Sequence, residues 1–272
     1  MGVVAMNKIM NNYIKTLAKN NERMDGRKLD EFRKEIKIEY GVSAKSAAGS
    51  AKVTIGDTVV VAGIKLTIGS PFTDTPEEGA LMVNVELSPP LASPDFESGP
   101  PDSYSIELAR LTDRAVRESG MIDVKKLCIK EGETIWMVNI DIYPINDGGN
   151  LFDACGLVAI AAILDTRLPT LKQVEEKYEA DYDNMTEERL PINEIPINLT
   201  IGKLGEHLVV DPTYEEEKAF DARLTVCITE DGQICSLQKG KDAPLTIEDL
   251  DAIISLAKSK AGKLRELFGG RQ

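Results

Sequence analysis

Histidine is nearly absent from this sequence, because the 272 residues include only His207. A single imidazole excludes metal sites that need two His ligands, and any Ser-His or Cys-His catalysis would have to use that one ring. His207 lies in the segment GKLGEHLVVDP, which predicts a turn leading into a strand. We therefore interpret it as an exposed or half-buried strand residue rather than a catalytic one.

Cysteine pairs and long hydrophobic runs are also missing. The four cysteines form no CxxC pair and three lie in apolar strand or helix patterns, so we expect buried reduced thiols; they are Cys128, Cys155, Cys227 and Cys235. The apolar stretch around residues 154–164 is far short of the roughly 20 residues that cross a bilayer, and no N-terminal apolar run precedes a cleavage site. We expect a cytoplasmic protein with no membrane partner.

Positive charge is scarce: 32 Lys and Arg stand against 45 Asp and Glu, for a net charge of −13. This excludes a generically basic nucleic-acid binder. A hydrophobic share of 42% is typical of a globular chain, with room for one large domain or two modest ones. No Walker A, GxGxxG, HExxH, EF-hand or GxSxG motif is present, which disfavours the corresponding nucleotide-dependent, metalloprotease and hydrolase chemistries.

Hydrophobic spacing in the first half predicts a helix followed by strands. Residues 6–19 carry apolar side chains at helical spacing, namely Met6, Ile9, Met10, Tyr13, Ile14 and Leu17. Residues 32–66 alternate in short runs separated by glycines, which is typical of strands joined by tight turns, and 81–87 predict another strand. The Pro-, Ser- and Gly-rich residues 88–103 predict a long surface loop.

The remaining sequence repeats the order of strands followed by helices. A helix over 105–120, capped by Ser103 or Ser105 and ended by Gly120, precedes a strand over 134–145 and a nearly all-apolar, buried helix over 151–166. Four strands and a final helix over 245–268, with Thr246 as its cap and Asp249 in its first turn, complete the chain. This order indicates an α+β fold with two successive layered units.

The acidic segment 173–189, which ends at Pro191, predicts a domain boundary. We therefore expect an N-terminal amphipathic helix over 1–21, a first domain over 22–190 and a second over 191–268.

The segment Arg23-Met24-Asp25-Gly26-Arg27 starts an ordered series of motifs. Taken alone, RMDGR predicts a charged turn and the later glycines predict hairpin corners. The series continues with Arg33, Gly41, Gly49-Ser50-Ala51, Gly56-Asp57-Thr58 and Ala62-Gly63-Ile64-Lys65. Together and in this order the motifs resemble the RNase PH family of phosphorolytic exoribonucleases. The resemblance covers residues 22–260 and implies an RNase PH-like fold.

Arg110, Arg114 and Arg117 follow the spacing i, i+4 and i+7, which places three guanidinium groups on one helix face. One interpretation is a solvated face balanced by Asp113 and Glu118. The other is a clamp for an RNA backbone, since forked donors suit phosphate oxygens. RNase PH-like proteins carry a matching Arg-rich helix, so the resemblance implies that these three arginines bind RNA.

Residues 147–150 (Asp-Gly-Gly-Asn) precede the buried helix. Backbone amides at a helix start can hold an anion, although the same residues suit any tight strand-to-helix turn. In catalytic RNase PH-like chains a small hydroxyl residue and an arginine follow the glycines and hold the attacking phosphate. Here these positions are Asn150 and Leu151, and a leucine cannot supply the missing positive charge.

The acidic segment 214–223 departs from the catalytic pattern as well. Catalytic members have an aspartate matching Glu217 and a second aspartate six residues later, where this chain has Arg223, which cannot ligate a metal. A solvated turn before a strand is the simpler interpretation of this acidic run, and we favour it. The resemblance thus implies no catalytic residues, no bound metal and no cofactor.

Within the family, the sequence is most similar to the non-catalytic RNase PH-like ring subunit of the archaeal exosome. That resemblance implies a six-membered ring, a trimer of heterodimers with a catalytic sister subunit, capped by RNA-binding proteins and threaded by single-stranded RNA. The alternative is a catalytic phosphorolytic 3′-exoribonuclease or nucleotidyltransferase with Glu217 and Asp221 as metal ligands. Asp221 and Arg223 are expected on the same strand face, which would put a cation in that metal site and disfavours the alternative.

Overall fold

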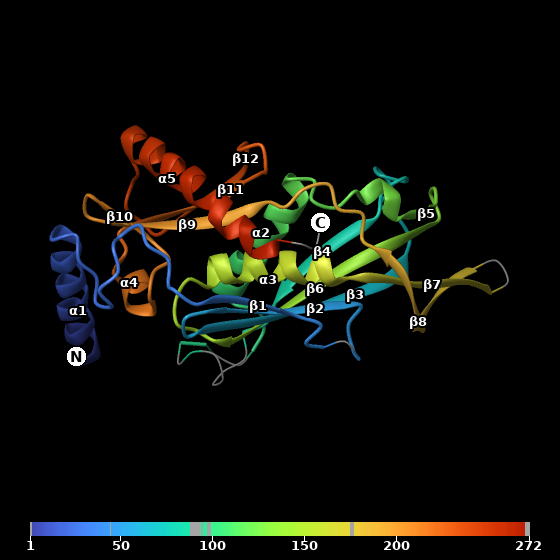
Figure 1. Cartoon of the computed structure of the whole chain (residues 1–272), viewed down its shortest axis with the longest axis horizontal. Helices are drawn as coiled ribbons and strands as arrows, with labels where there is room; N and C mark the ends of the chain where they lie inside the picture. The colour runs from blue at the N-terminus through green and yellow to red at the C-terminus, as the bar shows by residue number, and fades with distance from the viewer. Residues whose placement is uncertain are drawn as a thin grey trace.

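Two β-sheets and two helical layers alternate through the molecule, as Figure 1 shows. The computed structural model describes residues 2–43, 45–87, 93, 95–96, 99–174 and 177–269. Most of the predicted loop over 88–103 lies outside these residues. The order of the layers is a large sheet, the helices α2 and α3, a smaller sheet and the final helix α5. The predicted α+β class is confirmed.

The large sheet has the strand order β1-β2-β3-β6-β4, with β5 paired to β6. Its strands are β1 (Ile36–Tyr40), β2 (Gly49–Ile55), β3 (Thr58–Gly69), β4 (Ala80–Val85), β5 (Cys128–Lys130) and β6 (Thr134–Asn146). All neighbours are antiparallel except β4, which runs parallel to β6. In β3, buried residues alternate with more exposed ones, which fits a sheet covered by helices on one face only.

The small sheet has the order β10-β9-β11-β12 and is antiparallel throughout. Its strands are β9 (Ile197–Leu204), β10 (His207–Val210), β11 (Ala222–Ile228) and β12 (Ile234–Gly240). Every residue of β11 is buried, because α3 lies on one side of this sheet and α5 (Ile247–Arg265) on the other. The four strands predicted here are confirmed, as is the capping box of Thr246 and Asp249 at the start of α5.

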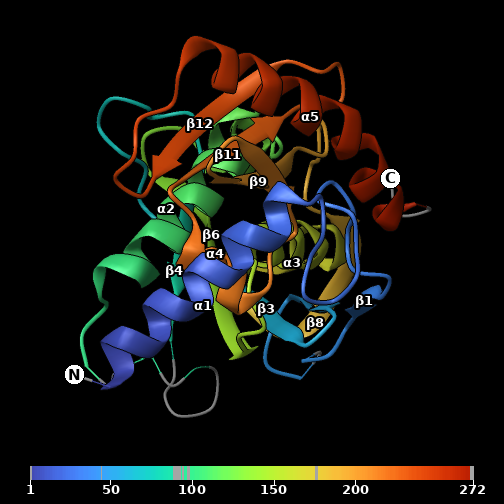
Figure 2. The same ribbon diagram turned by 90° about the vertical axis from the view of Figure 1, so that its left-hand side faces the viewer.

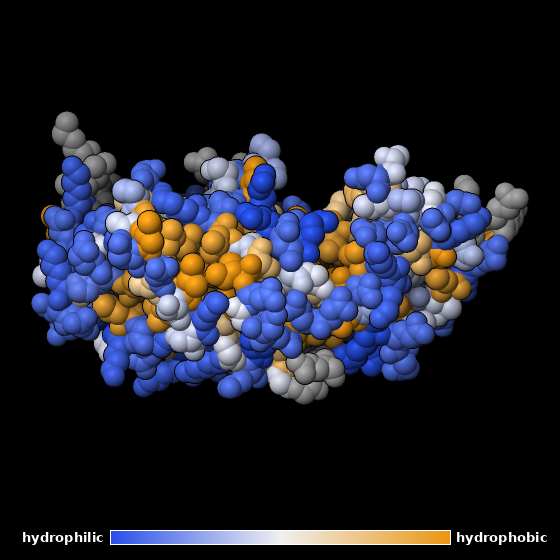
Figure 3. Space-filling model, turned by 90° about the horizontal axis from the view of Figure 1, so that it is seen from above, coloured by the Kyte–Doolittle hydropathy of each residue, from blue (hydrophilic) through white to orange (hydrophobic). Residues whose placement is uncertain are grey.

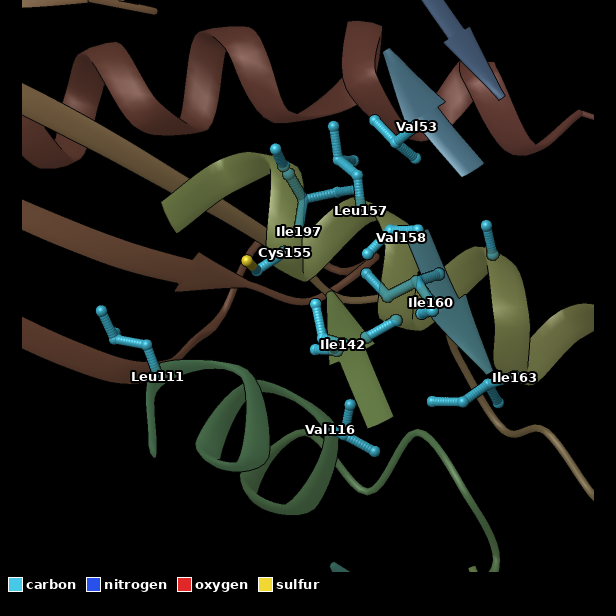
Figure 4. Packing of buried hydrophobic residues seen from close by; sticks show 14 of the residues in the cluster. Val53, Leu111, Val116, Ile142, Cys155, Leu157, Val158, Ile160, Ile163 and Ile197 are labelled. Carbon is cyan, nitrogen blue, oxygen red and sulfur yellow. The ribbon is translucent and has the colours of Figure 1, made fainter. Parts of the chain in front are cut away.

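Helix α3 (Leu151–Asp165) is the centre of the core. Fourteen of its 15 residues are buried, and it packs against β2 and β3 on one side and β9 on the other. Figure 4 shows Leu157, Val158 and Ile160 of this helix among Val53, Ile142 and Ile197 of the sheets. A single hydrophobic cluster therefore extends across both sheets. The predicted domain bounds, 22–190 and 191–268, remain predictions.

Helix α2 (Ser103–Glu118) lies between the edge strands β4 and β12 and contacts α3. Its N-cap is Asp102, whose carboxylate accepts the N–H of Ser105, so the predicted Ser103 or Ser105 cap was wrong. A carboxylate placed before the first turn satisfies the same free amides and adds a favourable charge. Gly120 ends the helix with φ of 69°, as predicted.

Two elements extend from this layered body. The hairpin β7 (Arg167–Val174) and β8 (Lys177–Arg189) contains the acidic segment, for which no strand was predicted. Helix α1 (Gly2–Lys19) lies against the short helix α4 (Tyr214–Ala219) at the opposite end, in front in Figure 2. Ile14 and Ala18 are buried there, whereas Ile9 and Tyr13 are more than half exposed.

The scarce residue types occupy ordinary positions. All four cysteines are free; Cys155 and Cys227 are buried, and Cys128 and Cys235 are partly exposed. His207 starts β10 and is half-buried, as predicted. Among the described residues, no helix combines the length and the apolarity that crossing a membrane requires.

Candidate functional site

The turn predicted at RMDGR is present, but the arginines on either side of it are buried. The Arg23 side chain is 1% exposed, and its Nε and Nη2 donate to the two carboxylate oxygens of Glu216 at 2.8 and 2.5 Å. Arg23 also donates to the carbonyl oxygens of Val210 and Asp211. The ion pair between Arg23 and Glu216 therefore connects the N-terminal part of the chain to α4.

Asp211 is the centre of this ion-pair network. Its carboxylate is fully buried and accepts hydrogen bonds from Arg27 at 3.0 Å, from Arg33 at 2.7 Å and from the Asn150 amide at 2.9 Å. Burial alone would raise the pKa of Asp211, but the hydrogen bonds and charge of Arg33 lower it below its ordinary value. We call these six residues, Arg23, Arg27, Arg33, Asn150, Asp211 and Glu216, the Asp211 network.

Three backbone amides of the loop before α3 have acceptors within the described part of the chain. The N–H of Gly148 donates to the Thr58 hydroxyl, that of Gly149 to the Asp147 carboxylate, and that of Asn150 to Glu217 at 3.1 Å. Gly149 has φ of 89°, and a Cβ there would lie 2.4 Å from the backbone of Thr213, so only glycine fits. The structure favours the tight-turn interpretation of this loop.

Glu217 accepts the backbone N–H of Asn150, the residue before α3. It lies on α4, a helix that the sequence did not predict, and is partly buried. Burial, and next the charge of Asp147, raises the pKa of Glu217 to about 7. The neighbouring Glu216 is 2% exposed and paired with Arg23, so the predicted solvated acidic turn was wrong. In the run Glu215-Glu216-Glu217, the sequence gives no signal that one glutamate is buried and paired with an arginine.

Arg223 lies on β11 and is 7% exposed. Its Nη2 binds Glu107 of α2 at 2.6 Å, and its guanidinium lies 3.8 Å from the centre of the Phe152 ring. The other face of the guanidinium packs on Gly240, where a Cβ would be 2.4 Å from its central carbon. Nη1 is buried and has no hydrogen-bond partner in the described part of the chain.

These groups line a pocket of about 300 Å³ between α2, the start of α3, α4 and the end of β12. Five aromatic rings contribute to its wall: Phe96, Tyr104, Phe152, Tyr214 and Phe220. Its charged lining includes Arg223, Lys218 and Lys241 together with Glu217 and Asp147.

Asp221 does not belong to this pocket. It precedes β11, and its carboxylate binds Lys15 of α1 at 2.5 Å and the N–H of Gly205 at 2.8 Å. Asp221 and Arg223 therefore point to different neighbours, which differs from the predicted common face. Within the described ranges, His, Cys, Asp and Glu side chains form no group of three or more that could hold a metal ion.

The three predicted RNA-binding arginines lie along one side of α2, but their guanidinium groups have different neighbours. Arg117 pairs with Asp113 at 2.6 Å and donates to the carbonyl oxygen of Leu81 on β4. Arg114 turns toward β12, where its Nη1 lies 3.4 Å from the amide oxygen of Gln238. Arg110 is exposed and borders a surface hollow beside β4. Their role in RNA binding stays a prediction.

Two models of one known family match two successive parts of this chain. The model for domain 1 of the 3′ exoribonuclease family (RNase PH) matches residues 31–169, and that for domain 2 matches residues 194–260. The chain belongs to the 3′ exoribonuclease family. The RNase PH resemblance and the RNase PH-like fold predicted from the RMDGR series are thereby confirmed.

Individual members of the RNase PH family align over nearly the whole chain. The exosome complex component Rrp42 of Methanothermobacter thermautotrophicus is 46% identical over 253 residues, 93% of this chain and 92% of that protein. Rrp42 of Methanocella arvoryzae is 46% identical over 264 residues, 97% of each chain. A solved structure described as the Archaeoglobus fulgidus exosome with RNA bound to the active site superimposes with a TM-score of 0.88 at 41% identity, covering 97% of this chain and 99% of the other.

Proposed function

We propose that this chain is a non-catalytic subunit of an exosome ring that degrades RNA from its 3′ end by phosphorolysis in the cytoplasm. Two features of the pocket support this proposal: Glu217 accepts the Asn150 N–H before α3, and Arg223 stands where the resemblance to catalytic members implies a second acidic residue. Phosphoryl transfer needs a metal and fixed positive charges at the reacting oxygens. A leucine, Leu151, follows the loop where an arginine would be required.

The second part of the proposal concerns the assembly of this chain into a ring. Relatives named as exosome components cover almost all of this chain, which supports assembly with a catalytic RNase PH-like sister subunit as a trimer of heterodimers. Exposed apolar side chains on α1 and on the β4–α2 edge offer surface for such pairing, namely Ile9, Tyr13, Met82 and Ile106. RNA-binding cap proteins complete the assembly that we propose.

The RNA-guiding role falls to Arg110, Arg114 and Arg117, which would contact the backbone of single-stranded RNA on its way to the sister subunit's site. A local arginine face is compatible with the net charge of −13, because phosphate contacts act at short range. Arg110 and Arg114 are the freer of the three, since Arg117 is already paired with Asp113.

Mixing this chain with the catalytic sister subunit tests assembly. Light scattering should report a hexamer, and the hexamer should shorten single-stranded RNA in the presence of phosphate. A stable monomer indifferent to the sister chain would contradict the proposal.

Arg114→Glu and Arg110→Glu in the assembled ring test guidance. Each should slow RNA degradation by weakening binding by on the order of 1 to 3 kcal/mol, similarly for all RNA sequences, while assembly and melting stay nearly unchanged. Lys258→Glu on the exposed side of α5 makes the same charge change as a control. If Arg114→Glu degrades RNA at the normal rate, or if the ring dissociates, these arginines are structural.

A further inference from the structure

Two of the four free cysteines meet across the hairpin of β11 and β12. Cys227 pairs with Ser236 in the register and Ile228 pairs with Ile234, so Cys235 is an extra residue of β12. In such a β-bulge, two residues of one strand lie opposite a single residue of the other. The side chains of Cys235 and Ser236 accordingly both hydrogen-bond to the Cys227 thiol.

The two thiols lie on the face of the small sheet that α2 contacts. Asn198, the partner of Cys227 in the register, donates to a backbone carbonyl oxygen of α2 at 3.5 Å. On β12, Gln238 is two residues from Ser236 and accepts from Arg114 of α2. Paired residues of antiparallel strands, and residues two apart on one strand, share a face. Helix α5 covers the opposite face, on the side of the molecule that Figure 3 shows from above.

The two thiols differ in exposure and in acidity. Cys227 is buried, whereas Cys235 is partly exposed on β12, an edge strand of the sheet. The hydrogen bond between the thiols raises the pKa of Cys227 and lowers the pKa of Cys235 below its ordinary value, although burial and the charge of Glu194 oppose the second shift. Cys235 is therefore the more reactive nucleophile, and Cys227 is the thiol that keeps its proton.

A thiolate that solvent can reach, with a second thiol within hydrogen-bond distance, is the arrangement of cysteines that respond to oxidants. The other two cysteines are not part of this hairpin, because Cys155 is buried in the core helix α3 and Cys128 lies on β5 of the large sheet. Cys128 is partly exposed, as Cys235 is, and therefore offers an internal comparison for reactivity.

We propose that Cys235 and Cys227 are an oxidation site, which a peroxide converts into a disulfide between β12 and β11. The Cys235 thiolate first attacks one peroxide oxygen; the O–O bond breaks, a sulfenic acid forms and hydroxide leaves. The Cys227 sulfur then attacks the Cys235 sulfur; the S–O bond breaks, the disulfide forms, and the oxygen leaves as water with the Cys227 proton. The two sulfurs lose two electrons, which reduce the peroxide. The reaction needs only this chain, so its outcome is independent of ring assembly.

Treatment of the full chain with hydrogen peroxide, followed by blocking of the remaining thiols and digestion with trypsin, tests the site. The tryptic peptide 224–239 contains both cysteines. It should lose the mass of two hydrogen atoms, and dithiothreitol should reverse this loss. Cys235 should be oxidised at least about tenfold faster than Cys128, because only Cys235 has a neighbouring thiol that lowers its pKa. Equal rates at the two cysteines, or a peptide 224–239 that stays reduced, would overturn the proposal.

Two variants separate the steps, with the melting temperature as a check that each is folded. Cys227→Ser keeps a hydroxyl that can donate to Cys235 but removes the second sulfur, so oxidation should stop at the sulfenic acid, which dimedone labels. Cys128→Ser leaves the pair intact and should form the disulfide at the rate of the unmodified chain. A folded Cys227→Ser without a dimedone adduct at Cys235 would contradict the order of the steps, and a disulfide that requires Cys128 would contradict the assignment of the pair.

Discussion

Two clusters of arginines and carboxylates lie on either side of Asn150, and they differ in whether they line the pocket: Arg223 and Glu217 do, whereas the arginines and carboxylates of the Asp211 network do not. The Asn150 side chain donates to Asp211, while its backbone N–H donates to Glu217. In the Asp211 network, the Asp211 and Glu216 carboxylates each accept bonds from a buried guanidinium. In the pocket, Arg223 has one ion pair and one nitrogen without a partner.

This difference indicates which cluster stabilises the fold and which one has the features of a binding site. In the Asp211 network both carboxylates are paired with arginines, and these ion pairs fix how the N-terminal segment and the small sheet meet. Arg27 Nη2 and Asn150 Oδ1 are buried without a hydrogen-bond partner in the described part of the chain, but neither residue lines the pocket. A cluster with an unpaired cation and a raised carboxyl pKa beside open space keeps the features of a binding site. The RMDGR segment thus lies in the Asp211 network, and the residues that depart from the catalytic pattern line the pocket.

Asp211→Ala should have the largest effect, because it leaves Arg27 and Arg33 buried without their carboxylate. We expect a loss of about 3 to 5 kcal/mol in the free energy of unfolding, measured by urea denaturation. Lys37→Ala breaks the exposed pair with Glu35 and should cost less than about 1 kcal/mol. Similar losses in the two variants would show that the Asp211 network is not what holds these elements together.

Glu217→Gln should change how stability depends on pH. The pKa of Glu217 is about 7 in the folded chain against an ordinary 4.5, so between these values the folded chain keeps a proton that the unfolded chain has released. Stability from this group therefore falls as the pH rises from 4.5 to about 7. Glutamine still accepts the Asn150 N–H and removes this loss. Relative to the unmodified chain, the variant should gain about 2 kcal/mol at pH 8 and almost nothing at pH 4. A pH-independent difference would exclude this titration.

Arg223→Met should have the smallest effect on stability. It loses one ion pair with the partly exposed Glu107 and a contact with Phe152, but it also removes a buried donor without a partner. These contributions oppose each other, and we expect a net change below about 1 kcal/mol by urea denaturation. A loss as large as that of Asp211→Ala would make Arg223 part of the structural framework and remove the distinction between the clusters.

Most of the fold could be predicted from the sequence, since periodicity reports burial directly. The uniformly apolar helix over 151–166 became the core helix α3, and the capping signal at Thr246 marked α5. The hairpin β7–β8 was missed because the acidic run was interpreted as a domain boundary, although Tyr178, Ala180 and Tyr182 alternate with charged residues in β8. Helix α4 is shorter than two turns, so it carries no helical periodicity.

Less of the site could be predicted. The departure of Leu151 and Arg223 from the pattern that the resemblance implies for catalytic members could be predicted, because it needs only residue identity. The burial of Glu216 and the contact of Asp221 with Lys15 depend on residues about 200 positions away. Such pairings are set by the meeting of α1 and the small sheet, and no local pattern encodes them.

Phosphorolysis by the purified chain alone tests the central claim most directly. With single-stranded RNA, phosphate and a range of magnesium concentrations, we predict no release of nucleoside diphosphates, because the resemblance to catalytic members implies an aspartate where this chain has Arg223. Arg223→Asp alone should not restore release, since Leu151 still supplies no positive charge. Phosphate-dependent shortening of RNA by the unmodified chain, abolished by Glu217→Ala, would contradict the account and establish this chain as a catalytic subunit.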